Sequence, residues 1–256
     1  MGYSKAYFEK QFNSYSDRFG NSWGMNWRAY MKLKNEKTLR ELKKIIKEYP
    51  YGIYLETGCA SGDFTEQILE AITVSGQYIG IDISDTAVSI CEKRFQNCSN
   101  VRFLAMALPD IPSEFLYDGI ICMDVFEYFD DAVQAECLRN FQRALKKGGK
   151  LVIQVPLPAV NEENLISLIK KEFSAQAIET VAYAYGQWCA KWFEYKLTYV
   201  ATKLFHNRRL GWFGVPFGWI AYQICANEKL IRFFFALNER FAPDIKSHLT
   251  IVARKD

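Results

Sequence analysis

Two glycines and a downstream aspartate have the spacing of a site that binds a nucleoside. Gly58 and Gly62 lie in the segment YLETGCASGDF, between a short apolar run and a helical stretch. Glycine lets a backbone turn tightly and approach a ligand without a side-chain clash. Asp82 follows Gly58 by 24 residues, at the end of the next apolar run, where its carboxylate suits two ribose hydroxyls. Each feature also has a plainer explanation, because the glycines can tighten a turn and Asp82 can cap a helix.

The glycine spacing distinguishes between classes of nucleoside cofactor. A dinucleotide motif, G-x-G-x-x-G, presents backbone amides to a pyrophosphate at the N-terminus of a helix. Here Gly58 and Gly62 have the spacing G-x-x-x-G, and the acidic Glu56 precedes them. We therefore expect a cofactor other than NAD. An NAD-linked oxidoreductase stays as an alternative, which nicotinamide absorbance would reveal.

The elements around these residues predict an α/β fold with a mostly parallel sheet. From Tyr51 onward, short apolar runs alternate with helical stretches, as in βαβ units. The expected strands are YGIYLET, QYIGIDI, VRFLAMA, YDGIICMDV, KLVIQVP, residues 175–182 and SHLTIVARK. The expected helices span residues 29–48, 62–73, 85–97, 131–146 and 161–172, and Gly148-Gly149 is expected to stop the fourth. We predict seven strands with helices on both faces, an N-terminal helical cap over 1–49 and a main domain over 50–256.

Four motifs in sequence order resemble the class I S-adenosylmethionine-dependent methyltransferases, especially the small-molecule branch of ubiquinone-type and nodulation-type enzymes. The family pattern acid-x-G-x-G-x-G is matched by Glu56, Gly58, Ala60 and Gly62, with alanine at the middle glycine. The other motifs are Gly80-Ile81-Asp82, YDGIICMDVFEYFDD and LKKGGKLVIQVP, so the resemblance covers roughly residues 50–157. It implies a Rossmann-like fold, S-adenosylmethionine as cofactor, S-adenosylhomocysteine as product, and methyl transfer.

The resemblance also assigns residues to the cofactor. The implied cofactor-binding residues are Glu56, Thr57, Gly58, Cys59, Ala60, Gly62, Asp82, Ile83, Ala107, Leu108 and Asp124. Among them, the loop from Gly58 to Gly62 corresponds to the methionine side, Asp82 to the ribose and Ile83 to the adenine. Met106 stands where the family usually has an acid for the adenine amine. The adenine would therefore rest on backbone groups near Ala107 and Leu108.

An N-terminal segment and two further residues complete the expected site. The stretch NSYSDRFGNSWGMNWRAY resembles the part of these enzymes that folds over the cofactor, with Tyr15 and Arg28 as expected contacts. Tyr128 and His206 are the candidate catalytic residues. Tyr128 replaces the histidine of the family's usual Glu-His pair, and its ordinary pKa near 10 makes it a weak base. His248, the other histidine of the chain, is expected to be structural.

Residues 183–241 form a compositionally distinct insert before the last strand. They contain 17 aromatic residues and a net charge of +5, from eight Lys/Arg against three Asp/Glu. Tyr185, Trp188, Trp192, Tyr195 and Tyr199 recur at spacings of three and four, which places them on one helix face. This stripe is either core packing or a lid over an apolar pocket. Residues 206–227 combine basic, aromatic and apolar residues, so peripheral membrane contact is a further hypothesis.

Charge and cysteine usage exclude several classes of protein. The net charge of +3 is too small to predict nucleic-acid binding. Seven cysteines are scattered without a CxxC pair, so we expect neither a metal site nor disulfides. The N-terminus lacks the apolar core of a signal peptide, so we expect a cytoplasmic protein. The acceptor is expected to be small and apolar or lipid-linked, and the departures at Met106 and Tyr128 keep a catalytically silent, cofactor-binding partner protein as an alternative.

Overall fold

The computed structural model describes most of the chain and divides it into two compact units. It describes residues 4–13, 28–72, 76–157, 159–185, 220, 223–224 and 227–256, without the side chain of Arg28. The first unit comprises Met1–Phe12, Lys37–Ala182 and His248–Asp256. The second comprises Asn13–Glu36 and Tyr183–Ser247. The predicted domain boundaries at 49 and 50 remain a prediction.

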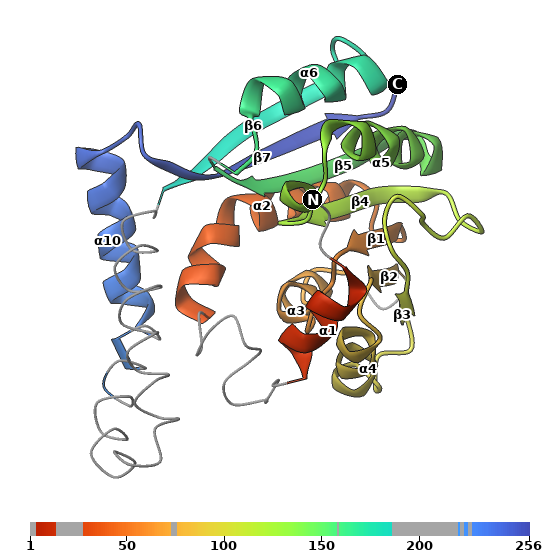
Figure 1. Cartoon of the computed structure of the whole chain (residues 1–256), viewed down its shortest axis with the longest axis horizontal. Coiled ribbons are helices and arrows are strands. Elements are labelled where there is room, and N and C mark those ends of the chain that lie inside the picture. Colours follow the sequence, from red (N-terminus) through yellow and green to blue (C-terminus); the bar gives the residue numbers. More distant parts are fainter. Residues whose placement is uncertain are drawn as a thin grey trace. The chain divides into compact units, whose positions relative to one another are not determined.

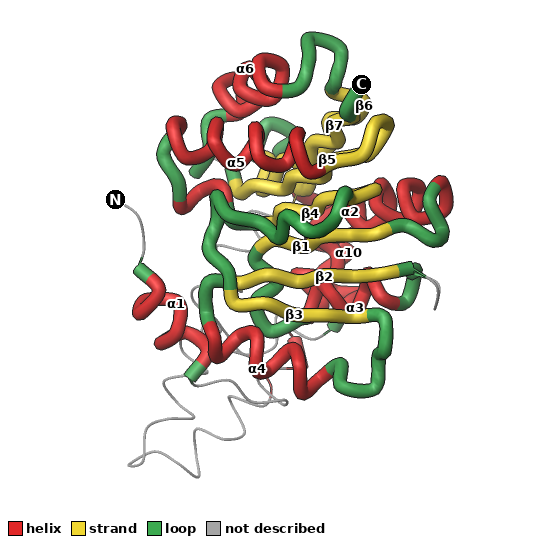
Figure 2. The backbone as a smooth tube through the Cα atoms, turned by 90° about the vertical axis from the view of Figure 1, so that its right-hand side faces the viewer, coloured by secondary structure: helices red, strands yellow, loops and turns green. Residues whose placement is uncertain are grey.

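A seven-stranded sheet with the order β3-β2-β1-β4-β5-β7-β6 is the centre of the fold (Figure 2). Its strands are β1 (Ile53–Thr57), β2 (Gln77–Asp82), β3 (Val101–Ala105), β4 (Tyr117–Met123), β5 (Leu145–Pro156), β6 (Ile178–Tyr185) and β7 (Lys246–Arg254). The pairs from β3 to β5 are parallel, whereas β7 runs antiparallel to β5. The predicted seven-stranded, mostly parallel Rossmann-like sheet is confirmed.

Helices cover both faces of this sheet (Figure 1). On one face lie α2 (Arg28–Glu48), α3 (Asp63–Leu69) and α4 (Asp85–Arg94), and on the other lie α5 (Asp131–Ala144) and α6 (Glu162–Glu172). The first face is sealed by fully or nearly fully buried residues such as Ile45, Ile68 and Cys91 against Tyr54 and Tyr78. Each such apolar side chain contributes about 1.5–3 kcal/mol by its burial. This core holds rigid the strand ends that carry the candidate site.

The second unit has a small apolar core of its own. Helix α10 (Glu228–Phe241) lies in the aromatic insert and buries Ile231 against Ala29, Tyr30 and Leu33 of α2. Two ion pairs flank this core, Lys32–Glu228 at 3.0 Å and Arg232–Glu36 at 3.1 Å. Phe234 and Phe235 of the insert therefore pack as core residues of the second unit. Of the aromatic stripe predicted over residues 185–199, only Tyr185 lies within the described residues.

The prediction that Gly148-Gly149 stops a helix is wrong. Helix α5 ends at Ala144, and both glycines lie inside β5. The pairing of β4 with β5 shifts register between Tyr117 and Gly119, and Gly148 has a φ of 80°. A Cβ on Gly149 would lie 2.9 Å from the carbonyl oxygen of Tyr117. The glycines therefore serve an irregular strand start rather than a helix end.

A short helix near the N-terminus lies within the predicted helical cap over 1–49 but outside the helix expected at 29–48. Helix α1 (Lys5–Phe12) buries Phe12, which is 2% exposed. At 8 residues it is too short to be stable alone, so tertiary contacts must hold it. Its partners are described with the site.

Candidate functional site

The predicted cofactor residues converge at the carboxyl ends of the parallel strands. The register pairs Thr57 with both Ile81 and Cys122, and Asp82 with Ala105. The loops that follow β1, β2, β3 and β4 therefore leave the same edge of the sheet. The strand order reverses between β1 and β4, and such switch points are where open α/β sheets bind ligands.

The loop after β1 is built from left-handed residues. Gly58, Ala60 and Gly62 have φ values of 75°, 49° and 79°. A Cβ on Gly58 would lie 2.4 Å from Cγ2 of Val125, and one on Gly62 would lie 2.6 Å from Cε2 of Phe95. Both glycines therefore make room for protein side chains, and the expectation that they also give a ligand access to the backbone stays a prediction. They therefore set the path of the loop itself.

Asp82 connects this loop to the start of α4. Its Oδ2 accepts the backbone N–H of Ala60 at 2.9 Å, and its Oδ1 accepts that of Ser84 at 2.9 Å. Burial raises the pKa of Asp82, while the hydrogen bonds from Ser84 and Ala60 oppose that effect. Each carboxylate oxygen can accept more than one hydrogen bond, so Asp82 retains acceptor capacity for hydroxyl groups. Asp82 is 8% exposed and lies at the carboxyl end of β2.

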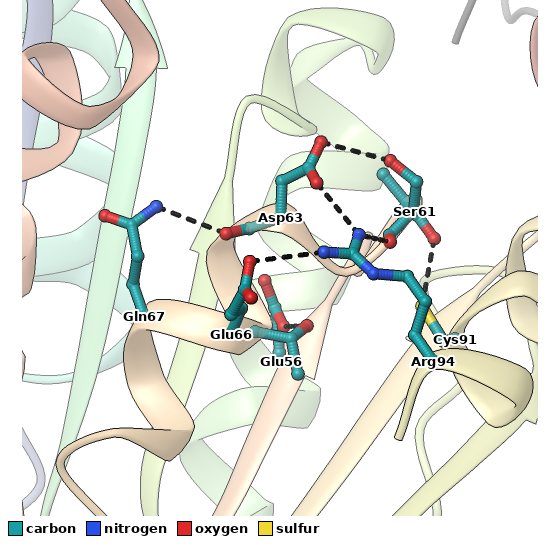
Figure 3. A network of polar contacts seen from close by, with 9 residues as sticks. Glu56, Ser61, Asp63, Glu66, Gln67, Cys91 and Arg94 are labelled. Atoms are coloured by element: carbon teal, nitrogen blue, oxygen red, sulfur yellow. Dashed lines mark hydrogen bonds and ion pairs between the residues drawn. The ribbon is translucent and has the colours of Figure 1, made fainter. Parts of the chain in front are cut away.

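Arg94 of α4 holds the same loop and the first turn of α3 (Figure 3). Its Nη1 donates to the carbonyl oxygen of Ser61 and to Oδ1 of Asp63 at 2.8 Å, and its Nη2 donates to Oε2 of Glu66 at 3.2 Å. The thiol of Cys91, one turn earlier, donates to the carbonyl oxygen of Ala60 at 3.2 Å. Helix α4 thus holds the loop through its carbonyl groups, whereas Asp82 holds it through the backbone N–H of Ala60. The sequence pattern did not reveal Arg94 as a site residue.

Glu56, Thr57 and Cys59 are buried beneath the loop. The carboxyl group of Glu56 accepts the hydroxyl of Thr65 at 2.6 Å and that of Tyr78, and the residue is 2% exposed. Burial raises the pKa of Glu56 to about 8, against the opposing effect of the Thr65 hydrogen bond. The hydroxyl of Thr57 donates to the carbonyl oxygen of Ile121 at 3.3 Å. Their direct contact with a cofactor remains a prediction, and their observed partners are protein groups.

The residues expected at the adenine follow β2 and β3. Ile83 and Leu108 are partly exposed, and Ala107 is exposed. The backbone N–H of Met106 donates to the carbonyl oxygen of Asp82 at 2.9 Å, which ties the two loops together. Apolar side chains and backbone groups therefore line this side of the strand edge.

Helix α1 links α4 to the segment after β4. The carboxylate of Glu9 accepts the backbone N–H of Asp85 at 2.6 Å and the hydroxyl of Thr86, at the N-terminus of α4. Phe8 contacts Tyr128 edge to face, with ring centroids 5.2 Å apart. Tyr128 lies in the short helix η1 (Phe126–Tyr128), directly after β4. The candidate catalytic Tyr128 is therefore at the strand edge, packed against an aromatic ring.

Asp124 and His248 meet at the far side of the same edge. Asp124 follows β4 with a φ of 53°, and its Oδ1 lies 3.8 Å from Nε2 of His248. His248 begins the central part of β7 and pairs with Pro156 at the end of β5. The sequence predicted a structural role for His248, because the pattern of one strand does not show which residues of other strands lie beside it. The structure places Asp124 there.

Several predicted residues lie outside the described residues. These are Tyr15, His206, the side chain of Arg28 and most of the segment 206–227. Their expected roles therefore remain predictions.

Comparison with known proteins agrees with this geometry. Residues 55–149 match the family profile described as a methyltransferase domain. A demethylmenaquinone methyltransferase from Staphylococcus carnosus is 30% identical over 103 residues, which are 38% of this chain and 40% of that protein. The chain spans less than half the length of the first curated relatives it matches.

Solved structures show the same fold. The N-methyltransferase NodS from Bradyrhizobium japonicum, in complex with S-adenosyl-L-homocysteine, has a TM-score of 0.55 at 19% identity over 72% of this chain and 91% of that one. A putative sarcosine dimethylglycine methyltransferase from Galdieria sulphuraria has a TM-score of 0.59 at 12% identity over 98% of both chains.

Proposed function

We propose that this chain transfers a methyl group from S-adenosylmethionine to a small acceptor, because residues 55–149 match the profile of a methyltransferase domain and the chain has the Rossmann-like fold of solved methyltransferases. The observation that carries the proposal is the pairing of Asp82 with the left-handed loop Gly58–Gly62 at the switch point of the sheet. That arrangement offers a carboxylate to ribose hydroxyls beside a tightly turned loop. S-adenosylmethionine supplies a methyl group that its sulfonium already activates.

The described residues fit the nucleoside part of this cofactor. Asp82 would hold the ribose hydroxyls, and Ile83, Ala107 and Leu108 would contact the adenine. The lack of an acid at Met106 leaves recognition of the adenine amine to backbone groups. The loop Gly58–Gly62 would carry the methionine part, with Asp124 at its end nearest β4. Catalysis would then come largely from holding the donor and acceptor in attack geometry.

We propose an oxygen or nitrogen atom of a small, apolar or lipid-linked molecule as the acceptor. The aromatic insert of residues 183–241, with its net charge of +5, supports an apolar acceptor that bears negative charge. The demethylmenaquinone methyltransferase among the relatives is named for a quinone acceptor, which is consistent with this class. Among the described residues, none of the helices has the length and apolarity needed to cross a membrane. Peripheral contact through 206–227 is a separate part of the proposal.

Calorimetric titration of the full chain with S-adenosylmethionine, S-adenosylhomocysteine and NAD tests the cofactor. We expect the first two to bind and NAD not to bind. Asp82→Asn should weaken both by about 10-fold to 100-fold, because a hydrogen bond to a charged group contributes about 1.5–3 kcal/mol. Asp110→Asn is the matched control, since it removes the same charge from an exposed position in the loop after β3. Binding of NAD alone, or equal losses in both variants, would contradict the proposal.

Turnover separates an enzyme from a silent cofactor-binding protein. The purified chain would be incubated with radiolabelled S-adenosylmethionine and panels of quinones, amines, acidic lipids and RNA. Label transferred to a small molecule or lipid would support the proposed acceptor class. Transfer to RNA alone would overturn that class, and tight binding without any transfer would favour the silent partner protein.

A further inference from the structure

The side of the site that receives the acceptor follows from the strand order. Asp82 ends β2 and Ala107 follows β3, so the nucleoside part of the cofactor would occupy the β2–β3 side of the edge. The rest of the cofactor must then extend over β1 toward β4. With the cofactor placed in this way, an acceptor would approach from the next strands in the order, which are β5 and β7.

Buried polar side chains lie on one face of β5 and β7 and lead toward the strand edge. Where α2 packs on the sheet, the hydroxyl of Thr38 donates to Oε1 of Gln154 at 2.6 Å and lies 2.8 Å from the hydroxyl of Thr250. His248 lies two residues before Thr250, on the same face of β7 and one step nearer the carboxyl edge. The polar groups therefore continue from the sheet interior to the strand edge and end at His248.

The environment of His248 suits a group that gains a proton. Its side chain is 12% exposed, and its Nδ1 is buried, so the exposed part of the ring lies on its other atoms. Nε2 lies 3.8 Å from the carboxylate of Asp124, which would stabilise an imidazolium. Asp124 has a left-handed φ of 53°, a conformation that a non-glycine residue adopts at some cost in energy and that recurs at functional sites.

We propose that His248 takes up the proton that the methyl acceptor loses during methyl transfer. Asp124 positions His248 and stabilises its protonated form. This inference rests on the proposed function. The acceptor's O–H or N–H bond breaks, its electron pair forms the bond to the methyl carbon, and the carbon–sulfur bonding pair stays on sulfur. The proton goes to Nε2 of His248, whose new positive charge faces Asp124. Tyr128 then orients the acceptor, or packs against Phe8, without acting as the base.

The chain offers a clean measurement, because His206 and His248 are its only histidines. Two imidazole signals can be followed by NMR with ¹⁵N-labelled histidine, and His206→Gln assigns them. The titration of His248 would be recorded without ligand, with S-adenosylhomocysteine and with S-adenosylmethionine. These two ligands differ in the methyl group and its positive charge.

We expect the sulfonium to lower the pKa of His248 by about half a unit or more relative to S-adenosylhomocysteine, because a unit charge within about 10 Å opposes protonation. Asp124→Asn should lower the pKa of His248 in the ligand-free chain, and asparagine tolerates the left-handed backbone. Glu127→Gln is the control for general charge loss: Glu127 and Asp124 both act electrostatically on buried Cys122, so both carboxylates lie near this end of β4. It should change the pKa of His248 less than Asp124→Asn does.

The outcomes separate this inference from the proposed function. If neither ligand binds by calorimetry, the proposed function fails. If both bind and the His248 titration is the same with each, the histidine is remote from the methyl group and the inference is overturned. An equal response to Glu127→Gln and Asp124→Asn would also overturn the role given to Asp124. Once an acceptor is found, His248→Gln should reduce kcat with unchanged cofactor binding, and the loss should shrink at high pH.

Discussion

Two buried carboxyl groups near the loop after β1 differ in the hydrogen-bond donors that the protein gives them. Asp82 accepts backbone N–H groups through both oxygens, which favours its charged form against the effect of burial. Glu56 accepts only hydroxyl groups among its observed partners, from Thr65 and Tyr78. Burial therefore dominates at Glu56, and its carboxyl group is largely neutral at pH 7. At the residue scale, Asp82 joins the loop after β1 to the start of α4 through backbone hydrogen bonds, whereas Glu56 is buried beneath that loop.

The raised pKa of Glu56 makes stability depend on pH. Its pKa rises on folding from the ordinary value to about 8, so the folded chain keeps a proton that the unfolded chain loses above about pH 4.5. The free energy of unfolding should therefore fall as pH rises through this window, by up to about 1.4 kcal/mol per pH unit from this group. Glu56→Gln should remove that contribution and be more stable than the natural chain at pH 8. Urea denaturation at pH 5 and pH 8 measures both.

A control keeps this test specific to Glu56. Glu70→Gln changes an exposed carboxylate at the end of α3 and should leave the pH dependence as it is. If Glu56→Gln has the same pH dependence as the natural chain, the buried carboxyl group is charged in the fold and the assignment is wrong.

At the scale of elements, the site depends on helix α4 as much as on the strands. At its N-terminus, the backbone N–H of Asp85 donates to the carboxylate of Glu9 from α1. In its last turn, Arg94 donates to Ser61 of the loop and to Asp63 of α3. Ser84 caps the helix by accepting the backbone N–H of Ala87 at 3.1 Å. One helix therefore joins helix α1, the carboxylate of Asp82 and the loop Gly58–Gly62.

Replacing Arg94 should loosen this connection. Arg94→Gln loses hydrogen bonds to a carbonyl group and to two exposed carboxylates, so we expect a loss of about 1 kcal/mol in stability after allowing for solvent screening. Hydrogen exchange should accelerate mainly in residues 58–66. Lys93→Gln, at an exposed position of the same turn, should leave exchange there unchanged. Acceleration spread evenly over the sheet would instead indicate general destabilisation and would contradict a local role.

At the scale of the whole molecule, the site residues discussed above that the structure describes fall in the first compact unit, whereas the predicted contacts Tyr15 and Arg28 fall in the second. Asp82, the loop Gly58–Gly62, Asp124 and His248 all fall in the first unit. The second unit has its own small core between α2 and α10. The parts of the site that the structure describes can therefore be studied as properties of the sheet and its helices.

Ligand binding to this unit should raise thermal stability by mass action. S-adenosylhomocysteine at 100 times its Kd should add about 2.7 kcal/mol, which corresponds to a rise in Tm of roughly 5–10 °C for a protein of this size. Differential scanning calorimetry measures the shift, and NAD at the same concentration should produce none. Asp82→Asn should reduce the shift at equal ligand concentration. An equal shift in that variant would remove Asp82 from the site.

The sequence by itself determined the sheet, most element boundaries and the residues at the strand ends. Apolar alternation and helical periodicity report which face of an element is buried, and parallel strands bring their carboxyl ends to one edge. Asp82 and the loop from Gly58 to Gly62 could therefore be placed together from spacing alone. The fold class needed no tertiary information beyond that rule.

Only the tertiary structure decided which side chains meet. Gly58 faces Val125, Arg94 holds Ser61, and His248 lies beside Asp124, although each pair is far apart in the chain. Periodicity carries no information about the partner across a sheet, because the partner depends on strand order and register. The irregular pairing that draws Gly148-Gly149 into β5 has the same origin. His248 has the sequence pattern of a structural strand residue. It became a candidate base only because the fold places β7 beside β5 and His248 beside Asp124.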